Sequence, residues 1–169
     1  MNKYKIPASI TLAQGILESN NGNSMLAKKA KNHFGIKCHG WKGKKIYADD
    51  DIKNECFRSY NSVAESFEDH SLFLINNKRY EFLFNLEITD YKSWSKGLKK
   101  AGYATNSQYA DILIKIIEEN KLYLYDGQNN YDANLENVSK RNIYLHPNNI
   151  KYVISKNDET FQDISKELD

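Results

Sequence analysis

The chain has 169 residues, enough for one domain of ordinary size and at most a fragment of another. Apolar residues make up 40% and charged residues 27% of the sequence, which favours a soluble globular protein over a disordered one. The net charge of +2 is too small to indicate a nucleic-acid partner, and no apolar run approaches the ~18 residues that suggest a membrane span.

The first predicted element is a helix over Pro7–Glu18. Proline suits a first helical turn, and apolar side chains recur at helical spacing at Ile10, Ala13 and Leu17. The helix should end in Ser19–Asn23, a run of turn-forming residues.

After this turn the sequence pattern changes from helical to a mixture of helix and strand. A second short helix is expected over Ser24–Lys31. Residues 33–60 contain glycines, three consecutive aspartates and short apolar runs, a pattern typical of two or three small strands around an exposed hairpin. If the strand extends through Asp49, Asp50 and Asp51, the first and third share one face and Asp50 lies on the other.

Three helices are predicted in the rest of the domain, and each has a capping residue: Ser62, in a capping box with Glu65, then Asp90 and Ser107. One helical stripe of the first helix comprises Val63, Phe67, His70 and Leu74, and the second helix carries Tyr91, Trp94 and Leu98. The buried side of the third helix is expected to comprise Tyr109, Ile112, Leu113, Ile116 and Ile117. Residues 1–125 should therefore form an α+β domain that is mainly α, with one small β-hairpin lobe.

The C-terminal part of the chain reads differently. Residues 126–142 are polar and asparagine-rich, as in a linker. In residues 143–169 we expect a strand over Tyr152–Ile154, a turn at Asn157 and Asp158, and a helix capped by Thr160. One strand and one helix bury too little surface to fold alone, so this segment is predicted to be half a module.

Glu18 is the first residue suited to chemistry. At the end of an apolar helix it faces the negative end of the helix dipole, which opposes ionisation, and partial burial would also raise its pKa. A raised carboxyl pKa is what a general acid at a glycosidic oxygen requires. The alternative is a solvated glutamate at a helix end, which one residue alone does not exclude.

The aspartates Asp49, Asp50 and Asp51 offer a second carboxylate. With Glu18 they would form the acid and base pair of glycoside hydrolysis. Three adjacent acids cannot all face one substrate, so at most one or two would act. A solvated turn, with or without an adventitious cation, is the alternative.

Cys38 and Cys56 bracket the predicted hairpin. With His33 and His39 they supply four potential zinc ligands, but their spacing matches no common zinc motif, and we expect no metal. A disulfide between the two cysteines is favoured if the protein is exported, and two free thiols remain the other alternative. His70 lies on an apolar helical stripe, so a hydrogen-bonded core histidine is favoured over a ligand or base.

Five ordered motifs then make the sequence recognisable. They are Ile6–Ser19, Asn32–Lys37, Phe57–Tyr60, Glu65–Leu74, and Gly102–Thr105 followed by Tyr109 and Ala110. Together they resemble the glucosaminidase family of peptidoglycan hydrolases, glycoside hydrolase family 73, over roughly residues 1–125. Five motifs in order are far more specific than any one alone.

This resemblance implies a lysozyme-like fold and cleavage of the β-1,4 bond on the reducing side of N-acetylglucosamine. Glu18 corresponds to the family's acid, and Tyr103 and Tyr109 correspond to an aromatic segment that contacts the sugar N-acetyl region. The second acid lies in the hairpin, where many members have glutamate and this chain has aspartates. Either a distant base activates water or the substrate N-acetyl group assists. Trp41 and Tyr47 are further candidates for sugar contacts through their aromatic faces.

Two features depart from the family pattern. Members usually have a further helix before the Ile-Pro-Ala-Ser motif, whereas this chain starts almost on it. The segment Tyr152–Ile164 is similar to the first half of a LysM glycan-binding module, but its usual Gly-Asp-Thr-Leu is replaced by Asn157–Phe161. We do not expect the segment to bind sugar in this form.

The leading functional hypothesis is an endo-β-N-acetylglucosaminidase that acts on peptidoglycan glycan strands without a cofactor, as a monomer. The alternatives are a non-catalytic glycan-binding or scaffold protein and a lytic transglycosylase on the same fold. We expect an extracytoplasmic location (secreted, periplasmic or in the cell envelope), although no secretory signal follows Met1.

Overall fold

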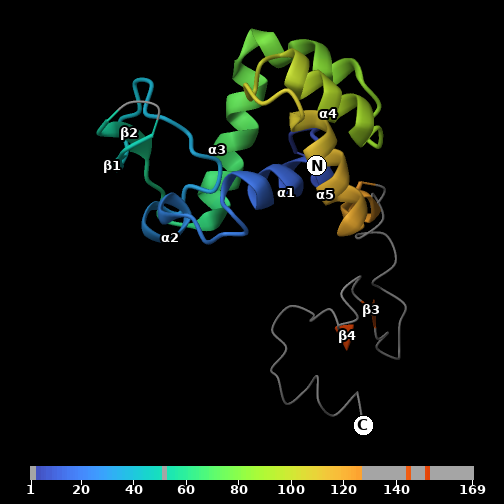
Figure 1. Ribbon diagram of the computed structural model, residues 1–169, viewed down its shortest axis with the longest axis horizontal. Helices are drawn as coiled ribbons and strands as arrows, with labels where there is room; N and C mark the ends of the chain where they lie inside the picture. The colour runs from blue at the N-terminus through green and yellow to red at the C-terminus, as the bar shows by residue number, and fades with distance from the viewer. Residues whose placement is uncertain (1–2, 51–52, 127–143, 146–150, 153–169) are drawn as a thin grey trace. The chain divides into compact units, whose positions relative to one another are not determined.

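The computed structural model describes residues 3–50 and 53–126 in full, together with the backbone of residues 144–145 and 151–152. The chain divides into two compact units, residues 1–127 and 128–169. The first unit contains, in chain order, α1 (Ala8–Glu18), α2 (Met25–Ala30), β1 (Lys45–Ala48), β2 (Glu55–Arg58), α3 (Val63–Asn76), the 3-10 helix η1 (Lys78–Asn85), α4 (Tyr91–Lys100), α5 (Tyr109–Glu119) and the 3-10 helix η2 (Leu122–Tyr125). The predicted fold class, mainly helical with a small β element, is confirmed (Figure 1).

Helix α1 is the centre of the first unit. It packs against α3, α4, α5 and η2. Its Ile10 and Ala13 have no exposed surface and join a core that includes Trp94 of α4 and Leu113 of α5. A helix with neighbours on so many sides is held in place by packing, which makes it a rigid support for the residue at its end.

The start of α1 is closed by a residue from the far end of the unit. Pro7 is the N-cap and has no capping side chain, but the Ser9 N–H donates to Asp126 Oδ1 at 2.8 Å. The Ser9 hydroxyl donates to the other oxygen of the same buried carboxylate. A carboxylate at a helix N-terminus is stabilised by the helix dipole and by the unpaired N–H groups there. Asp126 thus ties the segment after η2 to α1.

The β lobe is an antiparallel pair in which Lys45 lies opposite Arg58 and Ala48 opposite Glu55. It lies beside α2 and the start of α3, away from α4 and α5 (Figure 1). The buried Asn32 organises its base, because its side-chain amide donates to the carbonyls of both Ile36 and Arg58. Such a fully bonded amide fixes the loop that precedes the hairpin.

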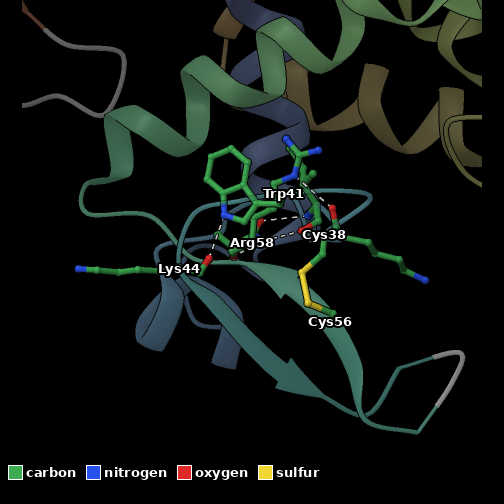
Figure 2. Close-up of a disulfide and its surroundings, with 8 residues drawn as sticks. Cys38, Trp41, Lys44, Cys56 and Arg58 are labelled. Atoms are coloured by element: carbon green, nitrogen blue, oxygen red, sulfur yellow. Dashed lines mark hydrogen bonds between the residues drawn. A yellow bond between two sulfur atoms is a disulfide. The ribbon is translucent and has the colours of Figure 1, made fainter.

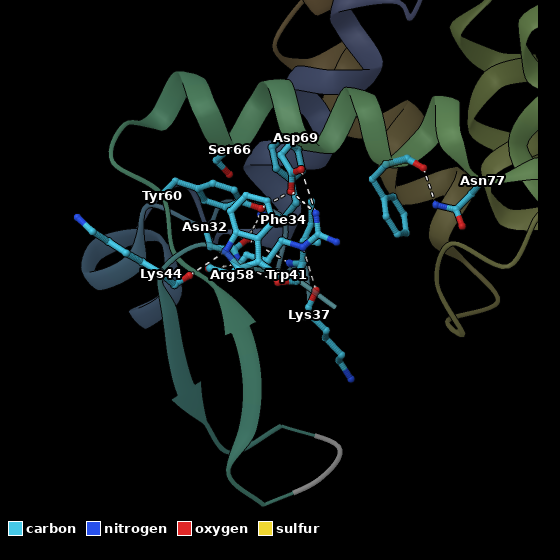
Figure 3. Close-up of polar contacts among 12 residues, drawn as sticks. Asn32, Phe34, Lys37, Trp41, Lys44, Arg58, Tyr60, Ser66, Asp69 and Asn77 are labelled. Carbon is cyan, nitrogen blue, oxygen red and sulfur yellow. Dashed lines mark hydrogen bonds and ion pairs between the residues drawn. The ribbon is translucent and has the colours of Figure 1, made fainter. Parts of the chain in front are cut away.

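An ion pair joins the β lobe to α3. Arg58 Nη1 lies 2.8 and 3.0 Å from the two carboxylate oxygens of Asp69, and the Tyr60 hydroxyl donates to Asp69 Oδ2 at 2.6 Å (Figure 3). Charge-assisted hydrogen bonds of this kind are stronger than neutral ones and set the geometry of the groups they join.

Several local predictions were wrong. Ser107 does not cap α5: the N-cap is Gln108, which makes no side-chain cap, and Asn106 accepts the Gln108 N–H in the turn before it. Ser62 caps α3 as predicted, but Glu65 accepts from the N–H of Asn61 and not from that of Ser62. Val63 begins the predicted stripe of α3 and is 46% exposed, because it is the first residue of that helix.

In the second unit, β3 (Tyr144–Leu145) pairs antiparallel with β4 (Lys151–Tyr152), and Tyr144 lies opposite Tyr152. The predicted strand Tyr152–Ile154 overlaps β4 at one residue. The rest of that prediction, with the turn and helix that follow, lies outside the described residues.

Among the described residues, no helix is long and apolar enough to cross a membrane.

Candidate active site

Glu18 is the last residue of α1, and the chain turns sharply after it. The buried Ser19 hydroxyl accepts the Gly22 N–H at 2.7 Å and donates back to the Gly15 carbonyl. Asn20 and Asn21 follow with φ of +50° and +54°, a left-handed conformation that asparagine tolerates better than most residues. This turn stops the helix directly after Glu18, whose side chain lines a cleft.

Two linked hydrogen bonds lead to the Glu18 carboxylate, and one of them reaches it directly. Tyr109, from the start of α5, donates its hydroxyl proton to Glu18 Oε1 at 2.8 Å. Gln14 of α1 donates from Nε2 to the Tyr109 oxygen at 2.9 Å. The Tyr103 ring stacks on Tyr109 with ring centroids 5.7 Å apart. One of the two carboxylate oxygens of Glu18 is therefore held by a neutral donor.

Burial raises the pKa of Glu18 above its ordinary value of 4.5, and the hydrogen bond from Tyr109 opposes that rise. Burial also holds the pKa of Tyr109 well above its usual range, so its hydroxyl remains a donor. A glutamic acid with a raised pKa retains a proton closer to neutral pH and can deliver it to a leaving group.

The cleft has a volume of about 650 Å³, within the range of ligand-binding clefts. Its lining on the helical side includes Phe73, Arg79, Tyr80, Tyr103 and Thr105. Its lining on the side of the β lobe includes Phe34, Lys37, His39, Ala48, Asp49, Asp50 and Phe57. Glu18 thus faces a concave site with aromatic and apolar surface and a few charged groups.

Two of the three predicted aspartates share this cleft with Glu18. Asp49 and Asp50 both line it, and the condition for the predicted alternation, a strand that extends through all three aspartates, is not met. The reason is that β1 ends at Ala48, and alternation holds only along an extended strand. Asp49 Oδ1 accepts the Asn54 N–H at 2.7 Å, and Asp50 lies 3.5 Å from Lys37 Nζ. Asp51 lies outside the described residues.

Trp41 and Tyr47, predicted to contact sugar, do not line this cleft. Tyr47 alternates with Ala48 along β1, so it points to the opposite face and is 56% exposed. Trp41 packs on the Arg58 guanidinium, 4.9 Å from the ring centre, and its indole N–H donates to the Lys44 carbonyl at 2.9 Å (Figure 2). Trp41 therefore stabilises the base of the β lobe.

A disulfide joins Cys38, in the loop before the hairpin, to Cys56 of β2, which lies opposite Tyr47 (Figure 2). Neither thiol is therefore available as a thiolate to bind zinc. Within residues 3–50 and 53–126, no group of three His, Cys, Asp or Glu side chains is placed to hold a metal. His33 packs against Phe67, while His39 lines the cleft.

His70 is a core residue, as predicted, but it is not hydrogen-bonded as predicted. It has no exposed surface, its ring stacks on Phe34 at 3.9 Å, and neither ring nitrogen has a partner in the described residues. Burial lowers the pKa of His70 to about 3, so the ring is neutral.

Sequence reasoning missed three residues of the site. Gln14 lies four positions before Glu18, and that helical spacing was a signal that the two share a face. Lys37 pairs with Asp50 and, at 2.8 Å, with Glu55, but no sequence pattern indicates this. Arg79 reaches the cleft from η1, whose existence the periodicity did not reveal.

A mainly helical domain with a half-buried glutamic acid at a helix end, facing a cleft bordered by an acidic hairpin, defines the class of lysozyme-like glycoside hydrolases. The chain belongs to the glucosaminidase family: residues 1–122 match the profile described as mannosyl-glycoprotein endo-beta-N-acetylglucosaminidase.

Similar proteins agree with this assignment. The chain is 34% identical to exo-glucosaminidase LytG of Bacillus subtilis, covering 86% of this chain and 57% of LytG. It is 32% identical to peptidoglycan hydrolase FlgJ of Vibrio parahaemolyticus, covering 66% of this chain and 40% of FlgJ. The chain therefore spans about half the length of these relatives.

Solved structures show the same fold. The catalytic domain of the autolysin Auto from Listeria monocytogenes matches with a TM-score of 0.63 and 32% identity, over 73% of this chain and 77% of that domain. The glycoside hydrolase domain of Salmonella typhimurium FlgJ matches with a TM-score of 0.62 and 29% identity, over 81% and 89%.

Proposed function

We propose that this chain hydrolyses the β-1,4 bond between N-acetylglucosamine and N-acetylmuramic acid within peptidoglycan glycan strands, with Glu18 as the general acid. The observation that carries the proposal is the Glu18 carboxyl, whose pKa is raised by burial and whose Oε1 accepts from Tyr109 in the cleft. The family match and the names of the relatives support the substrate class.

In this mechanism Glu18 protonates the glycosidic oxygen as the bond to the anomeric carbon breaks. A carboxylate among Asp49, Asp50 and Asp51 then activates the attacking water from the other side of the sugar. The position of Asp49 and Asp50 in the lining of the same cleft supports this role. Assistance by the substrate N-acetyl group is the alternative, in which the aspartates act only through their charge.

The decisive experiment combines Glu18→Gln with mass spectrometry of digested peptidoglycan. The variant keeps an acceptor for Tyr109 but has no acidic proton, so turnover should fall by about 10²–10⁴-fold or more. Glu119→Gln is the matched control, because Glu119 also ends a helix, α5, and is exposed. Near-parental turnover by Glu18→Gln would contradict the assignment.

The products distinguish this function from its alternatives. A hydrolase leaves reducing N-acetylglucosamine ends, whereas a lytic transglycosylase leaves anhydro-sugar ends. Binding without cleavage by the parent protein would identify a scaffold. Because LytG is named an exo-enzyme, the endo action proposed for this chain needs its own test. Endo cleavage releases oligosaccharides of mixed length early, and exo cleavage releases one small product throughout.

We propose further that the protein acts outside the cytoplasm, as a monomer. Peptidoglycan lies in that compartment, and the Cys38–Cys56 disulfide fits an oxidising environment. The linker predicted over residues 126–142 would begin after Asp126, which is buried against α1, and residues 143–169 would be a partial LysM-like segment. Fractionation of the producing cells and sedimentation analysis of the purified chain test the location and the monomeric state.

A further inference from the structure

Gln14 and Glu18 lie one helical turn apart on α1 and are joined by a residue of another helix. Gln14 Nε2 donates to the Tyr109 hydroxyl oxygen at 2.9 Å, and Tyr109 donates to Glu18 Oε1 at 2.8 Å. Gln14 has no exposed surface, and Tyr109 is 3% exposed. The three groups form a short chain of hydrogen bonds that is buried at Gln14 and ends at the part-buried carboxyl of the proposed acid.

The direction of this chain follows from the number of protons. A tyrosine hydroxyl has one proton to donate, and it can accept at the same time. Because the Gln14 amide N–H occupies an acceptor site of Tyr109, the single Tyr109 proton is directed at Glu18. Within the described residues, Gln14 Oε1 has no partner and Glu18 Oε2 accepts no hydrogen bond.

We propose that Gln14 is a positioning residue for the acid. Its amide orients the Tyr109 hydroxyl, which then occupies Glu18 Oε1 and leaves Oε2 to carry the proton that is transferred to the substrate. This inference rests on the proposed function of Glu18. It makes Tyr109 a residue that positions the acid, in addition to any contact that Tyr109 makes with sugar.

The sign of the expected effect can be worked out. A donor to Oε1 stabilises the ionised carboxylate and opposes the rise in Glu18 pKa that burial causes. Without Gln14 the Tyr109 proton is no longer directed at Glu18, and the Glu18 pKa rises. The other titratable groups of the cleft are Lys37, His39, Asp49, Asp50, Arg79, Tyr80 and Tyr103, and all of them stay in place in the variants below.

The experiment compares Gln14→Met, Tyr109→Phe and the double variant. Methionine keeps the length and burial of Gln14 and removes its donor. The alkaline limb of kcat/KM should move up by about one pH unit, a tenfold change in the acid's ionisation constant. Turnover at the optimum should fall roughly 10- to 100-fold, because small misplacements of a catalytic group are costly. The double variant should match Tyr109→Phe alone, because Gln14 acts only through Tyr109.

A second readout does not depend on activity. The Glu18 carboxyl carbon, followed by NMR in glutamate-labelled protein, gives its pKa directly in each variant. Gln14→Glu is a second variant of equal size that replaces the donor with an acceptor and should also raise the Glu18 pKa. Gln108→Met, at an exposed position next to Tyr109, is the control and should change nothing.

The outcomes separate this inference from the function on which it rests. If the parent protein does not cleave peptidoglycan, the function fails, while the NMR titration still tests the hydrogen-bond chain. If the parent cleaves and Gln14→Met leaves the Glu18 pKa unchanged, the inference fails. A fall in that pKa also overturns it, because it would mean that Tyr109 donates to Gln14. If no Gln14 variant folds, Tyr109→Phe tests the same chain of hydrogen bonds. An unchanged Glu18 pKa in that variant would contradict the proposal.

Discussion

At the scale of single residues, burial of Glu18 in the folded protein opposes ionisation of its carboxyl group. Its carboxyl is half-buried, which raises its pKa above the ordinary value of 4.5. The folded protein therefore binds more protons at this position than the unfolded chain does, at pH values between the two pKa values. In that window the stability of the parent protein falls as the pH rises.

Removing the charge should reverse this effect. We expect Glu18→Gln to gain thermal stability relative to the parent as the pH rises from about 4.5 towards neutral, because glutamine does not ionise and still accepts from Tyr109. Scanning calorimetry of both proteins at pH 4 and pH 7 measures the difference in Tm at each pH. A difference that is the same at both pH values would show that the Glu18 pKa is not raised by folding.

The second carboxylate is also a question about single side chains. Asp49 closes the hairpin turn through the Asn54 N–H, whereas Asp50 lies in the cleft near Lys37 without closing that turn. We expect Asp50→Asn to lower turnover about 10²-fold or more, as loss of a general base does, and Asp49→Asn to have a smaller effect. Rates of release of reducing ends by these variants and by Asp51→Asn measure this.

Other patterns in that series have clear meanings. Modest and similar losses in all three variants would favour assistance by the substrate N-acetyl group. If all three single variants and the triple variant cleave at the rate of the parent protein, the hairpin has no catalytic role.

At the scale of elements, α1 has a defined partner at each end. Asp126 accepts two hydrogen bonds from Ser9 at its start, and the turn around Ser19 closes its end. The helix that carries Glu18 is thus held by a residue 117 positions away from Ser9 in the sequence.

Asp126→Ala should lower the free energy of unfolding by roughly 2 kcal/mol, because it leaves the buried donors of Ser9 without a partner. Asp90→Ala is the matched control: Asp90 caps α4 through the Ser93 N–H, but it is exposed, so the loss should be about 1 kcal/mol. Urea unfolding of the three proteins compares them. If Asp126→Ala costs no more than Asp90→Ala, Asp126 is not a special support of α1.

Helical periodicity predicted α1, α3, α4 and α5 because their apolar faces are regular, and turn residues predicted the hairpin. The 3-10 helix Lys78–Asn85 was missed because short 3-10 segments carry no clear period. The Ser107 cap was not found because α5 has Gln108 as its N-cap, and Asn106 closes the turn before it by accepting the Gln108 N–H. Glu18 was found through its helix, but its bond to Tyr109 spans 91 positions, and no local pattern contains such a contact.

At the scale of the molecule, the cleft is assembled from segments that are distant in sequence. Glu18 ends α1, Tyr103 and Thr105 precede α5, and Asp49 and Asp50 follow β1. The Arg58–Asp69 ion pair and the Cys38–Cys56 disulfide hold the β-lobe side in position (Figures 2 and 3). Because the two sides come from different elements, a cleft residue on one side can be substituted without changing the residues of the other side.

Arg79 offers such a separate change on the helical side. It is exposed, it lines the cleft, and its ring neighbour Tyr80 lies 4.6 Å from the guanidinium. The peptide stems of peptidoglycan carry carboxylates, whereas neutral chitin oligosaccharides carry none. Guanidinium groups bind carboxylates in a fixed, bidentate geometry through two parallel hydrogen bonds. Arg79 is therefore suited to distinguish the two substrates.

We expect Arg79→Gln to raise KM for stem-bearing glycan fragments about tenfold, the cost of one charge-assisted hydrogen bond, with little change in kcat. KM for chitin oligosaccharides should stay the same, because they offer no carboxylate. Lys78→Gln is the control, since Lys78 is an exposed neighbour that does not line the cleft. Steady-state kinetics on both substrates decides. An equal rise in KM for both would mean that Arg79 shapes the cleft, and no change for either would remove it from substrate binding.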